Sequence, residues 1–246
     1  GVFCGAKVIS KNINLTALPN ELVTIIGPVG SGKTSLLLAI LNEMTRTSGN
    51  IQINGSIFYV PQEPWIFSSS IKQNILFGRP FVKEKFERIV AVCSLTHDLY
   101  QFESRENTLI GEKGINLSGG QRARINMARA LYSDAQIYLF DDPLSAVDAN
   151  VAKHLMDECI NGYLREKTRI LVTHQTHQLV NVKKINLIEN GEIKFAGDYE
   201  SLKQSGIKLE FTMSETNSNN GGVVRSQFSK VSGIAHLAAP QRQYVS

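Results

Sequence analysis

Short apolar runs separated by polar turns recur along the N-terminal part of the chain. Residues 7–18 alternate loosely between apolar and polar positions, which is typical of an edge strand or a hairpin. Residues 22–26 form an apolar, β-branched run that predicts a buried strand, whereas residues 35–41 are strong helix formers without a breaker. Two more strands are predicted on either side of an Asn-Gly turn, at residues 51–53 and 56–60.

From about residue 83 to residue 132 the apolar positions recur at helical spacing instead. One face of a first helix is formed by Phe86, Ile89, Val90 and Cys93. Residues 119–131 predict a second, strong helix. This block therefore predicts a helical subdomain, at about residues 83–132, that is inserted into an α/β core.

Strand and helix patterns alternate again after this block. Buried strands are predicted at residues 136–140 and 169–173, with a helix between them that Asp148 caps and that runs to about Leu164. An Asn-Gly pair at residues 190–191 predicts a hairpin, and a short closing helix begins near Asp198. These elements complete one α/β domain, for which we expect the bounds 1–213.

The composition changes after Met213, where serine, asparagine and glycine replace the patterned sequence. This is the composition of a linker, and we expect residues 214–246 to form a disordered tail. The chain contains neither an apolar run long enough for a membrane span nor a signal peptide. Because it begins with Gly1 rather than methionine, we interpret it as a piece of a longer protein.

Composition and charge narrow the possible functions only slightly. With 42% hydrophobic and 20% charged residues, the 246-residue chain resembles an ordinary globular protein. A formal net charge of +4 is too small and too dispersed to indicate a nucleic-acid partner, and we expect none. The cysteines, Cys4, Cys93 and Cys159, have neither disulfide nor metal spacing, so we expect free thiols in a reducing compartment.

A glycine-rich loop between the strand at 22–26 and the helix at 35–41 is the strongest chemical signal in the chain. It matches the pattern G-x-x-x-x-G-K-[ST], whose glycines let backbone N–H groups wrap around nucleotide phosphates at a helix start. Lys33 would place a cation on the β- and γ-phosphates, and the Thr34 hydroxyl would ligate Mg²⁺. The predicted nucleotide-binding residues here are Gly27, Pro28, Val29, Gly30, Ser31, Gly32, Lys33, Thr34 and Ser35.

Two acidic residues follow the predicted strand at 136–140. A buried strand that ends in a carboxylate is where such nucleotide hydrolases hold Mg²⁺, so Asp141 is predicted to orient the ion, usually through water. Asp142 is then placed to align or deprotonate the attacking water. Aspartates after a strand also occur in turns and helix caps, but the phosphate loop upstream favours the catalytic interpretation.

A serine and two glycines open the predicted helix at 119–131. Ser118, Gly119, Gly120 and Gln121 would form a second anion site, because helix N-termini attract negative charge. One nucleotide rarely needs two phosphate sites in the same chain. The segment is therefore either a flexible N-cap or a contact for a nucleotide that another domain holds.

The order of these motifs resembles the nucleotide-binding domain of an ABC transporter. The phosphate loop is followed by Gln62, the LSGGQ segment at 117–121, the acidic strand end, residues 145–148 and His174. The resemblance extends from about residue 7 to residue 213. It implies a P-loop NTPase with an ABC-type α/β ATPase core, an antiparallel β subdomain and the inserted α-helical subdomain. It also implies that ATP and Mg²⁺ are the cofactors.

The resemblance assigns roles that the residues alone do not. Gln62 would sense Mg²⁺ and the γ-phosphate and link the site to the transmembrane domain, while His174 would contact the γ-phosphate. Residues 145–148 would cross the interface with a second nucleotide-binding domain, and residues 118–121 would complete the ATP site of that partner. The implied catalytic residues are Asp142, His174 and Gln62, and the implied metal-site residues are Thr34, Gln62 and Asp141.

Two segments, residues 60–78 and 108–114, are similar to the first nucleotide-binding domain of subfamily C, the multidrug-resistance-associated exporters. The resemblance implies that residues near 62–78 and Glu112 dock on transmembrane domains of the same transporter. Trp65, Ile66 and Phe67 are then expected to serve as exposed apolar anchors. The full protein would lie in the membrane, with this domain on the cytoplasmic face.

The chain departs from the family pattern at two positions. Most ABC ATPases carry glutamate in place of Asp142, and the aspartate is one methylene shorter, so we expect slow hydrolysis. The family stacks adenine on an aromatic residue upstream of the phosphate loop, where only Phe3 is available here. Either Phe3 binds adenine or the aromatic residue precedes Gly1.

The resemblance implies ATP-driven transport of organic anions or xenobiotics, powered by head-to-tail dimerisation with a second nucleotide-binding domain. An alternative is a regulatory nucleotide sensor that gates a channel or a receptor with little turnover. A soluble ABC ATPase of DNA repair or translation is disfavoured, since the chain has neither a coiled-coil insert nor tandem domains.

Overall fold

The structure is a computed structural model that describes residues 2–4, 7–111, 115–175, 179 and 182–207. Residues 2–4 and 7–9 are described by their backbone alone. The chain divides into two units, Gly1–Met213 and Ser214–Ser246, and every described residue belongs to the first.

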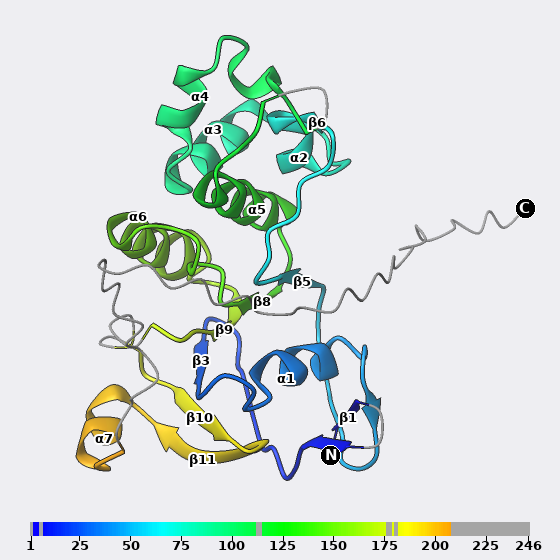
Figure 1. The fold of residues 1–246 in the computed structure, drawn as a ribbon, viewed down its shortest axis with the longest axis vertical. Coiled ribbons are helices and arrows are strands. Elements are labelled where there is room, and N and C mark those ends of the chain that lie inside the picture. Colours follow the sequence, from blue (N-terminus) through cyan, green and yellow to red (C-terminus); the bar gives the residue numbers. More distant parts are fainter. Residues whose placement is uncertain (1, 5–6, 112–114, 176–178, 180–181, 208–246) are drawn as a thin grey trace, which may run out of the picture. The chain divides into compact units, whose positions relative to one another are not determined.

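A six-stranded sheet forms the centre of the first unit, in the order β11-β10-β3-β9-β8-β5 (Figure 1). Its neighbouring strands pair in parallel, apart from the antiparallel hairpin of β10 and β11, whose Asn190-Gly191 turn has positive φ at both residues. These strands confirm the sequence predictions, with small shifts at their ends. They are β3 (Leu22–Ile26), β5 (Ile57–Val60), β8 (Ile137–Asp141), β9 (Thr168–Val172), β10 (Ile185–Glu189) and β11 (Glu192–Gly197).

The sheet is buried on both faces, because alternate side chains of its strands enter two different apolar clusters. Ile170 and Val172 of β9 belong to the cluster that contains α1, whereas Leu171 belongs to the cluster that contains α6. Asp148 caps α6 as predicted, accepting hydrogen bonds from two backbone N–H groups. The helices that cover the sheet are α1 (Lys33–Ile40), α6 (Ala149–His154) and its π-helical continuation η2 (Leu155–Tyr163); α7 (Tyr199–Gln204) follows the hairpin.

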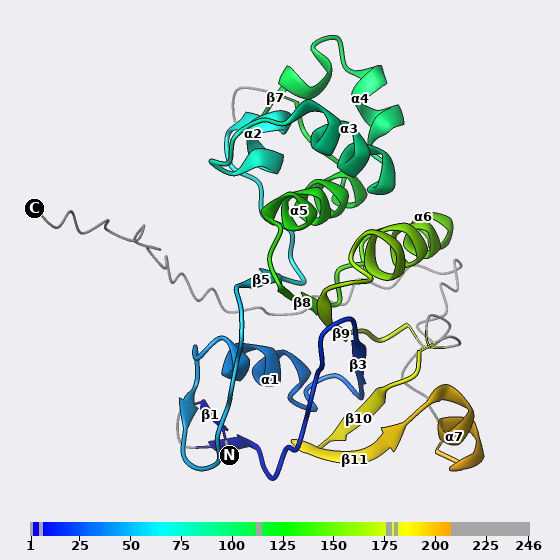
Figure 2. The same ribbon diagram turned by 180° about the vertical axis from the view of Figure 1, so that it is seen from behind.

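A group of helices is inserted between β5 and β8, as the sequence predicts, and lies in the upper part of Figure 1. Helices α2 and α3 both pack on the long helix α5 (Figure 2). Helix α2 was not predicted, although Ser70 caps its start and Phe77 ends it in the left-handed conformation. The elements are β6 (Ser69–Ser70), α2 (Ile71–Leu76), α3 (Lys83–Val92), α4 (Thr96–Gln101), a 3₁₀ helix (Arg105–Asn107), β7 (Leu109–Ile110) and α5 (Gly119–Ser133).

A small antiparallel sheet, in the order β2-β1-β4, consists of β1 (Val2–Cys4), β2 (Lys7–Ser10) and β4 (Thr45–Arg46). Two sequence predictions need correction here. Residues 11–18 form no strand, so the predicted strand ends at Ser10, and the predicted strand at 51–53 is absent. The apolar side chains of Ile51 and Ile53 instead line a cavity of about 520 Å³ with Ile13 and Leu15, rather than the face of a paired strand.

The described cysteine side chains agree with the expectation of free thiols. Cys93 and Cys159 are buried, and their sulfur atoms lie 3.7 Å apart, which is too far for a disulfide. Among the described residues there is no group of His, Cys, Asp and Glu side chains with the arrangement of a metal cluster. Within the same residues, no helix is long and apolar enough to cross a membrane.

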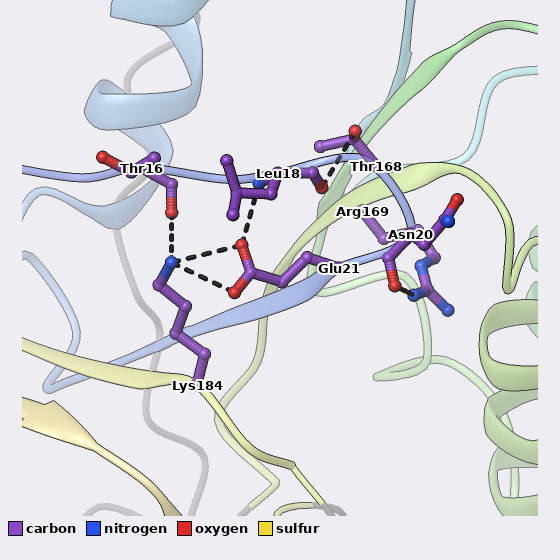
Figure 3. Close-up of polar contacts among 7 residues, drawn as sticks. All are labelled: Thr16, Leu18, Asn20, Glu21, Thr168, Arg169 and Lys184. Atoms are coloured by element: carbon purple, nitrogen blue, oxygen red, sulfur yellow. Dashed lines mark hydrogen bonds and ion pairs between the residues drawn. The ribbon is translucent and has the colours of Figure 1, made fainter.

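A polar network fixes the loop that leads into β3 (Figure 3). The ammonium group of Lys184 donates to the Thr16 carbonyl and to the Glu21 carboxylate, at 2.6 and 3.1 Å. The buried guanidinium of Arg169 donates to the carbonyls of Asn20, Ile160 and Lys167. Both interactions lie at the amino ends of β3 and β9, so they position these strands from the edge opposite the phosphate loop.

Replacing Arg169 with methionine should lower the free energy of unfolding by about 2 kcal/mol or more, because buried carbonyl groups lose their donor. Urea denaturation monitored by circular dichroism measures this change. Lys203→Met is the control, since Lys203 contacts Glu200 and the Tyr199 ring at the surface, and this substitution should change stability by less than about 1 kcal/mol. Equal effects of the two substitutions would contradict the assigned role of Arg169.

Candidate functional site

The predicted site residues converge at the carboxyl edge of the sheet. The glycine-rich loop follows β3, Asp141 ends β8, and His174 lies just beyond β9. Since β3, β9 and β8 are neighbouring parallel strands, the segments that follow them meet at one edge. This is where ligands bind in open α/β sheets.

The loop of residues 27–34 is bent so tightly that glycine is required at its start. Gly27 has φ of +150°, and a Cβ atom placed on it would lie 2.1 Å from the carbonyl oxygen of Ile188. Gly30 also has positive φ, but a Cβ atom there would meet nothing within 4 Å. The loop is therefore packed against β10 at Gly27 and open at Gly30.

Two polar groups inside the loop, the Ser31 hydroxyl and the Lys33 ammonium, could bind an anion. The buried Ser31 hydroxyl has no hydrogen-bond partner among the described residues. The Lys33 ammonium donates to the carbonyl oxygens of Gly27 and Pro28, each at 2.8 Å. Burial lowers the pKa of Lys33, and the nearby Asp142 and Asp141 oppose that shift. A phosphate group would satisfy Ser31 and neutralise Lys33, so the loop fits a polyphosphate ligand.

Asp141 is buried, and both of its carboxylate oxygens are held. The Thr34 hydroxyl donates to Oδ1 at 3.1 Å, and the Tyr59 hydroxyl donates to Oδ2 at 3.0 Å. Burial raises the pKa of Tyr59, and Asp141 raises it further, so the phenol stays protonated and remains a donor. Carboxylate and hydroxyl oxygens are ligands that Mg²⁺ prefers, so Asp141 and Thr34 together fit the metal that the sequence predicts.

Tyr59 was missed by the sequence analysis. It lies on β5, which pairs in parallel with β8, and it is in register with Leu139, two residues before Asp141. A tyrosine in the middle of an apolar strand is an ordinary sequence feature, so no local signal distinguishes it. Its role depends on the strand order of the sheet, which places β5 beside β8 at the edge.

Asp142 lies in a strained and buried position. Its φ of +46° is left-handed, which aspartate tolerates better than most residues, and its side chain is almost completely buried. Burial raises the pKa of the Asp142 carboxyl, while His174 and Lys33 lower it. Burial and Lys33 lower the pKa of the half-buried His174, and the two aspartates oppose this. The structure thus brings Lys33, Asp141, Asp142 and His174 into one electrostatic cluster.

The segment 118–121 forms a complete cap rather than a flexible one. The Ser118 hydroxyl accepts a hydrogen bond from the Gln121 N–H, and the Gln121 side chain accepts one from the Ser118 N–H. Asp98 holds the other end of this side chain and also pairs with Arg124. A Cβ atom placed on Gly120 would lie 3.4 Å from the Ala146 carbonyl oxygen. Within the described residues, no hydrogen bond joins the segment to the phosphate loop. Gly119 lies beside Gly120 in the first turn of α5.

Three predicted residues are not placed in this cluster by the described part of the structure. Gln62 is exposed just beyond β5 and forms no hydrogen bond with the described side chains of Asp141 or Thr34. Phe3 lies in β1, but its side chain is outside the described part, so adenine stacking stays a prediction. Glu112, predicted to help in docking, lies outside the described residues altogether.

Comparison with known proteins identifies the fold. The family model described as "ABC transporter" matches residues 10–145, which is more than half of the chain. The chain belongs to the ABC transporter family. Its relatives belong to subfamily C, as the sequence motifs indicate.

Three such relatives show how much of each protein is matched. The chain is 51% identical over 197 residues to the probable multidrug resistance-associated protein lethal(2)03659 of Drosophila melanogaster. It is 44% identical over 207 residues to human ATP-binding cassette sub-family C member 4, and 50% identical over 184 residues to ABC transporter C family member 7 of Arabidopsis thaliana. The matches cover 80%, 84% and 75% of this chain but only 14%, 16% and 12% of these relatives.

Domains of this family bind ATP, generally with Mg²⁺. The residues of the ABC domain described here fit both groups. The unpartnered Ser31 hydroxyl and the buried Lys33 ammonium suit phosphate oxygens, while Thr34 and Asp141 offer oxygen ligands to a hard cation. Mg²⁺ would neutralise phosphate charge and hold the β- and γ-phosphates in place.

Tyr59→Phe should weaken Mg²⁺ binding in the presence of ATP by about tenfold, because Asp141 loses the hydrogen bond that orients it. ATP binding in EDTA should stay at the wild-type level, since the hydrogen bond of the phenol goes to the predicted metal ligand Asp141. Titration of MgCl₂ against a fluorescent ATP analogue measures both. Tyr199→Phe on the remote helix α7 is the matched control. Equal losses with and without Mg²⁺ would contradict this role of Tyr59.

Proposed function

We propose that this domain binds ATP with Mg²⁺ and hydrolyses it slowly, and that it thereby powers transport through transmembrane domains of the same protein. The observation that carries the proposal is the convergence of Lys33, Asp141, Asp142 and His174 beside an open phosphate loop. The transported compounds proposed from the resemblance are organic anions and xenobiotics. The domain would work at the cytoplasmic face of the membrane as part of the full protein.

The proposed chemistry is attack of water on the γ-phosphorus of ATP, with ADP as the leaving group. Asp142 would accept the proton from the water, and His174 would contact the γ-phosphate. A general base must lie about 2.6–3.2 Å from the proton-bearing oxygen, and misplacement by about 1 Å costs on the order of a hundredfold in rate. The side chain of Asp142 is one methylene shorter than that of glutamate, and its backbone is fixed just after β8 in the left-handed conformation. Its carboxylate would therefore lie farther from the attacking water, and we expect slow ATP hydrolysis.

We propose a second nucleotide-binding domain, oriented head to tail, as the partner that completes the site. The capped start of α5 offers backbone N–H groups and the Ser118 hydroxyl to an anion, yet it has no hydrogen bond to the described part of the domain's own phosphate loop. A Cβ atom placed on Gly120 would lie 3.4 Å from the Ala146 carbonyl oxygen and 3.7 Å from the Val147 side chain, so the segments 118–121 and 145–148 are neighbours. This arrangement supports a shared surface for the partner's nucleotide.

The proposed docking surface for the transmembrane domains contains an exposed aromatic patch. Trp65 is 44% exposed and Phe77 is 47% exposed, and their rings lie 5.3 Å apart. Ile66 and Phe67 are partly buried, which corrects the prediction that all three anchors are exposed; Ile66 packs against the core instead. Phe77 was not among the predicted anchors, because its place beside Trp65 depends on the fold of α2.

Replacing Lys33 with alanine should weaken ATP binding by about tenfold or more, because the buried cation no longer offsets phosphate charge.

Asp142→Glu should raise turnover by about tenfold or more, since the longer side chain reaches the water. Isothermal titration and phosphate release measure these effects, with Lys153→Ala on the exposed face of α6 as the control. Tight ATP binding without ATP hydrolysis, in both the wild type and the Asp142→Glu variant, would favour the nucleotide-sensor alternative.

Trp65→Ala should leave ATP binding unchanged but reduce the transport obtained per ATP hydrolysed in a membrane transporter that carries this domain. The reason is that Trp65 supplies apolar contact area without touching the phosphate loop. Vesicle uptake and ATPase rates, measured on the same preparation, give the ratio. Tyr100→Ala removes an aromatic side chain from α4 that is more exposed than Trp65, at 68% against 44%, and serves as the control. Unchanged transport in the Trp65 variant would refute the docking surface.

A further inference from the structure

A buried arginine lies directly beneath the exposed aromatic patch. The guanidinium carbon of Arg129 is 3.9 Å from the centre of the Trp65 ring, 5.6 Å from that of Phe77 and 5.9 Å from that of Phe67. The three rings also contact one another, with centroids 5.3 to 6.2 Å apart. Arg129 itself is completely buried. The patch is therefore an aromatic layer built on a single cation.

The hydrogen bonds of Arg129 connect the segments that carry these rings. Its guanidinium donates to the Trp65 carbonyl, to the backbone and side-chain oxygens of Asn74, and to the Asn126 side chain, at 2.7–3.2 Å. Asn74 in turn accepts from the Phe67 N–H and donates to the Phe67 carbonyl. One side chain thus fixes both the loop after β5 and helix α2.

The described contacts of Arg129 are hydrogen bonds and ring contacts rather than ion pairs. Among the described residues no carboxylate lies within ion-pair distance of it, in contrast to Arg124, which pairs with Asp98 on the same helix. Burial lowers the pKa of Arg129 to about 10, so the group is still charged at neutral pH. Burying a cation that has no carboxylate partner among the described residues costs free energy, which its hydrogen bonds and ring contacts have to offset. An apolar residue would avoid this cost, so the arginine at this position points to a purpose for its fork of donors.

The place of Arg129 along α5 suggests that purpose. The helix starts at the capped segment 118–121, and Arg129 lies about 16 Å further along its axis. Gln62, Trp65 and Phe67 lie in the segment that follows β5. The same rigid helix therefore contacts the proposed partner surface at one end and the aromatic patch near the other.

We propose that Arg129 is the positioning residue that sets the aromatic patch and couples it to the capped start of α5. The coupling part rests on the proposed function, in which a partner domain engages residues 118–121 and transmembrane segments dock at Trp65 and Phe77. Movement of α5 upon engagement of the partner then displaces the patch directly, because Arg129 contacts both the carbonyl and the ring of Trp65. Asn74 extends this hold to α2.

The chain offers a specific probe, because Trp65 is its only tryptophan. Arg129→Met should increase quenching of Trp65 fluorescence by acrylamide about twofold or more and reduce its near-ultraviolet circular dichroism, since the ring loses its support. Arg129→Lys keeps a cation near the ring but loses the fork of donors, so it should give intermediate signals and a partial rescue.

Arg169→Lys is the matched control, because Arg169 is also buried, also donates to backbone carbonyls and has no contact with Trp65. It should lower stability while leaving the Trp65 signals at the wild-type level. Trp65 signals that stay unchanged in Arg129→Met, or that change equally in Arg169→Lys, would overturn the proposal. If the methionine variant fails to fold, the comparison of the two lysine variants decides.

A second measurement tests the coupling. In a membrane transporter that carries this domain, Arg129→Lys should lower the ratio of transport to ATP turnover about fivefold, with the ATP dissociation constant unchanged. Parallel loss of ATP binding and transport would mean that Arg129 has only a structural role. Absence of ATP binding in the wild-type domain would refute the proposed function instead, and the Trp65 signals would still decide whether Arg129 sets the patch.

Discussion

The candidate site depends on the parallel register of β8, β9 and β3. Asp141 of β8 lies in register with Val172 of β9, which in turn lies in register with Ile25 of β3. The next backbone hydrogen bonds, from Asp142 to Val172 and from Thr173 to Ile25, continue this alignment past the strand ends. Because of it, a loop, a carboxylate pair and a histidine from three distant parts of the chain emerge at one edge.

Burial gives this edge its chemical character. It lowers the pKa of the Lys33 ammonium and raises the pKa of the Asp142 carboxyl, and each group opposes the shift of the other. The fold thus holds the charged groups of Lys33 and Asp142 in place, and their mutual attraction opposes the cost of burying them. A phosphate anion with its divalent cation would complete the balance, which explains why the phosphate loop and the acidic strand end have to share one edge.

Two buried arginines fix segments at the ends of the strands: the loop before β3 and the segment after β5. Arg169 holds the carbonyls of the loop before β3, and Arg129 holds those of the segment after β5. A guanidinium suits both positions, since its planar fork of five donors can bind several carbonyls at once. The strands of the site are therefore positioned from outside by hydrogen bonds to backbone, and the aromatic patch is built on one of these anchors.

Features that depend on local backbone chemistry could be predicted from the sequence. The glycine loop, the capped starts of α5 and α6 and the Asn-Gly hairpin all follow from residue types at fixed short spacings, and the structure contains each of them. The prediction of a strand at 51–53 was wrong, because the apolar residues of this segment line a cavity instead of a paired sheet face. Periodicity cannot distinguish these two ways of burying a side chain.

The roles of Tyr59 and Arg129 could not be predicted in the same way. Tyr59 reaches a carboxylate 82 residues away, and Arg129 reaches carbonyls 55 and 64 residues away. Nothing in a short window of sequence marks either residue, since a strand tyrosine and a helix arginine are common. Strand order and helix packing bring such distant groups together, and the contacts exist only once the whole domain has folded.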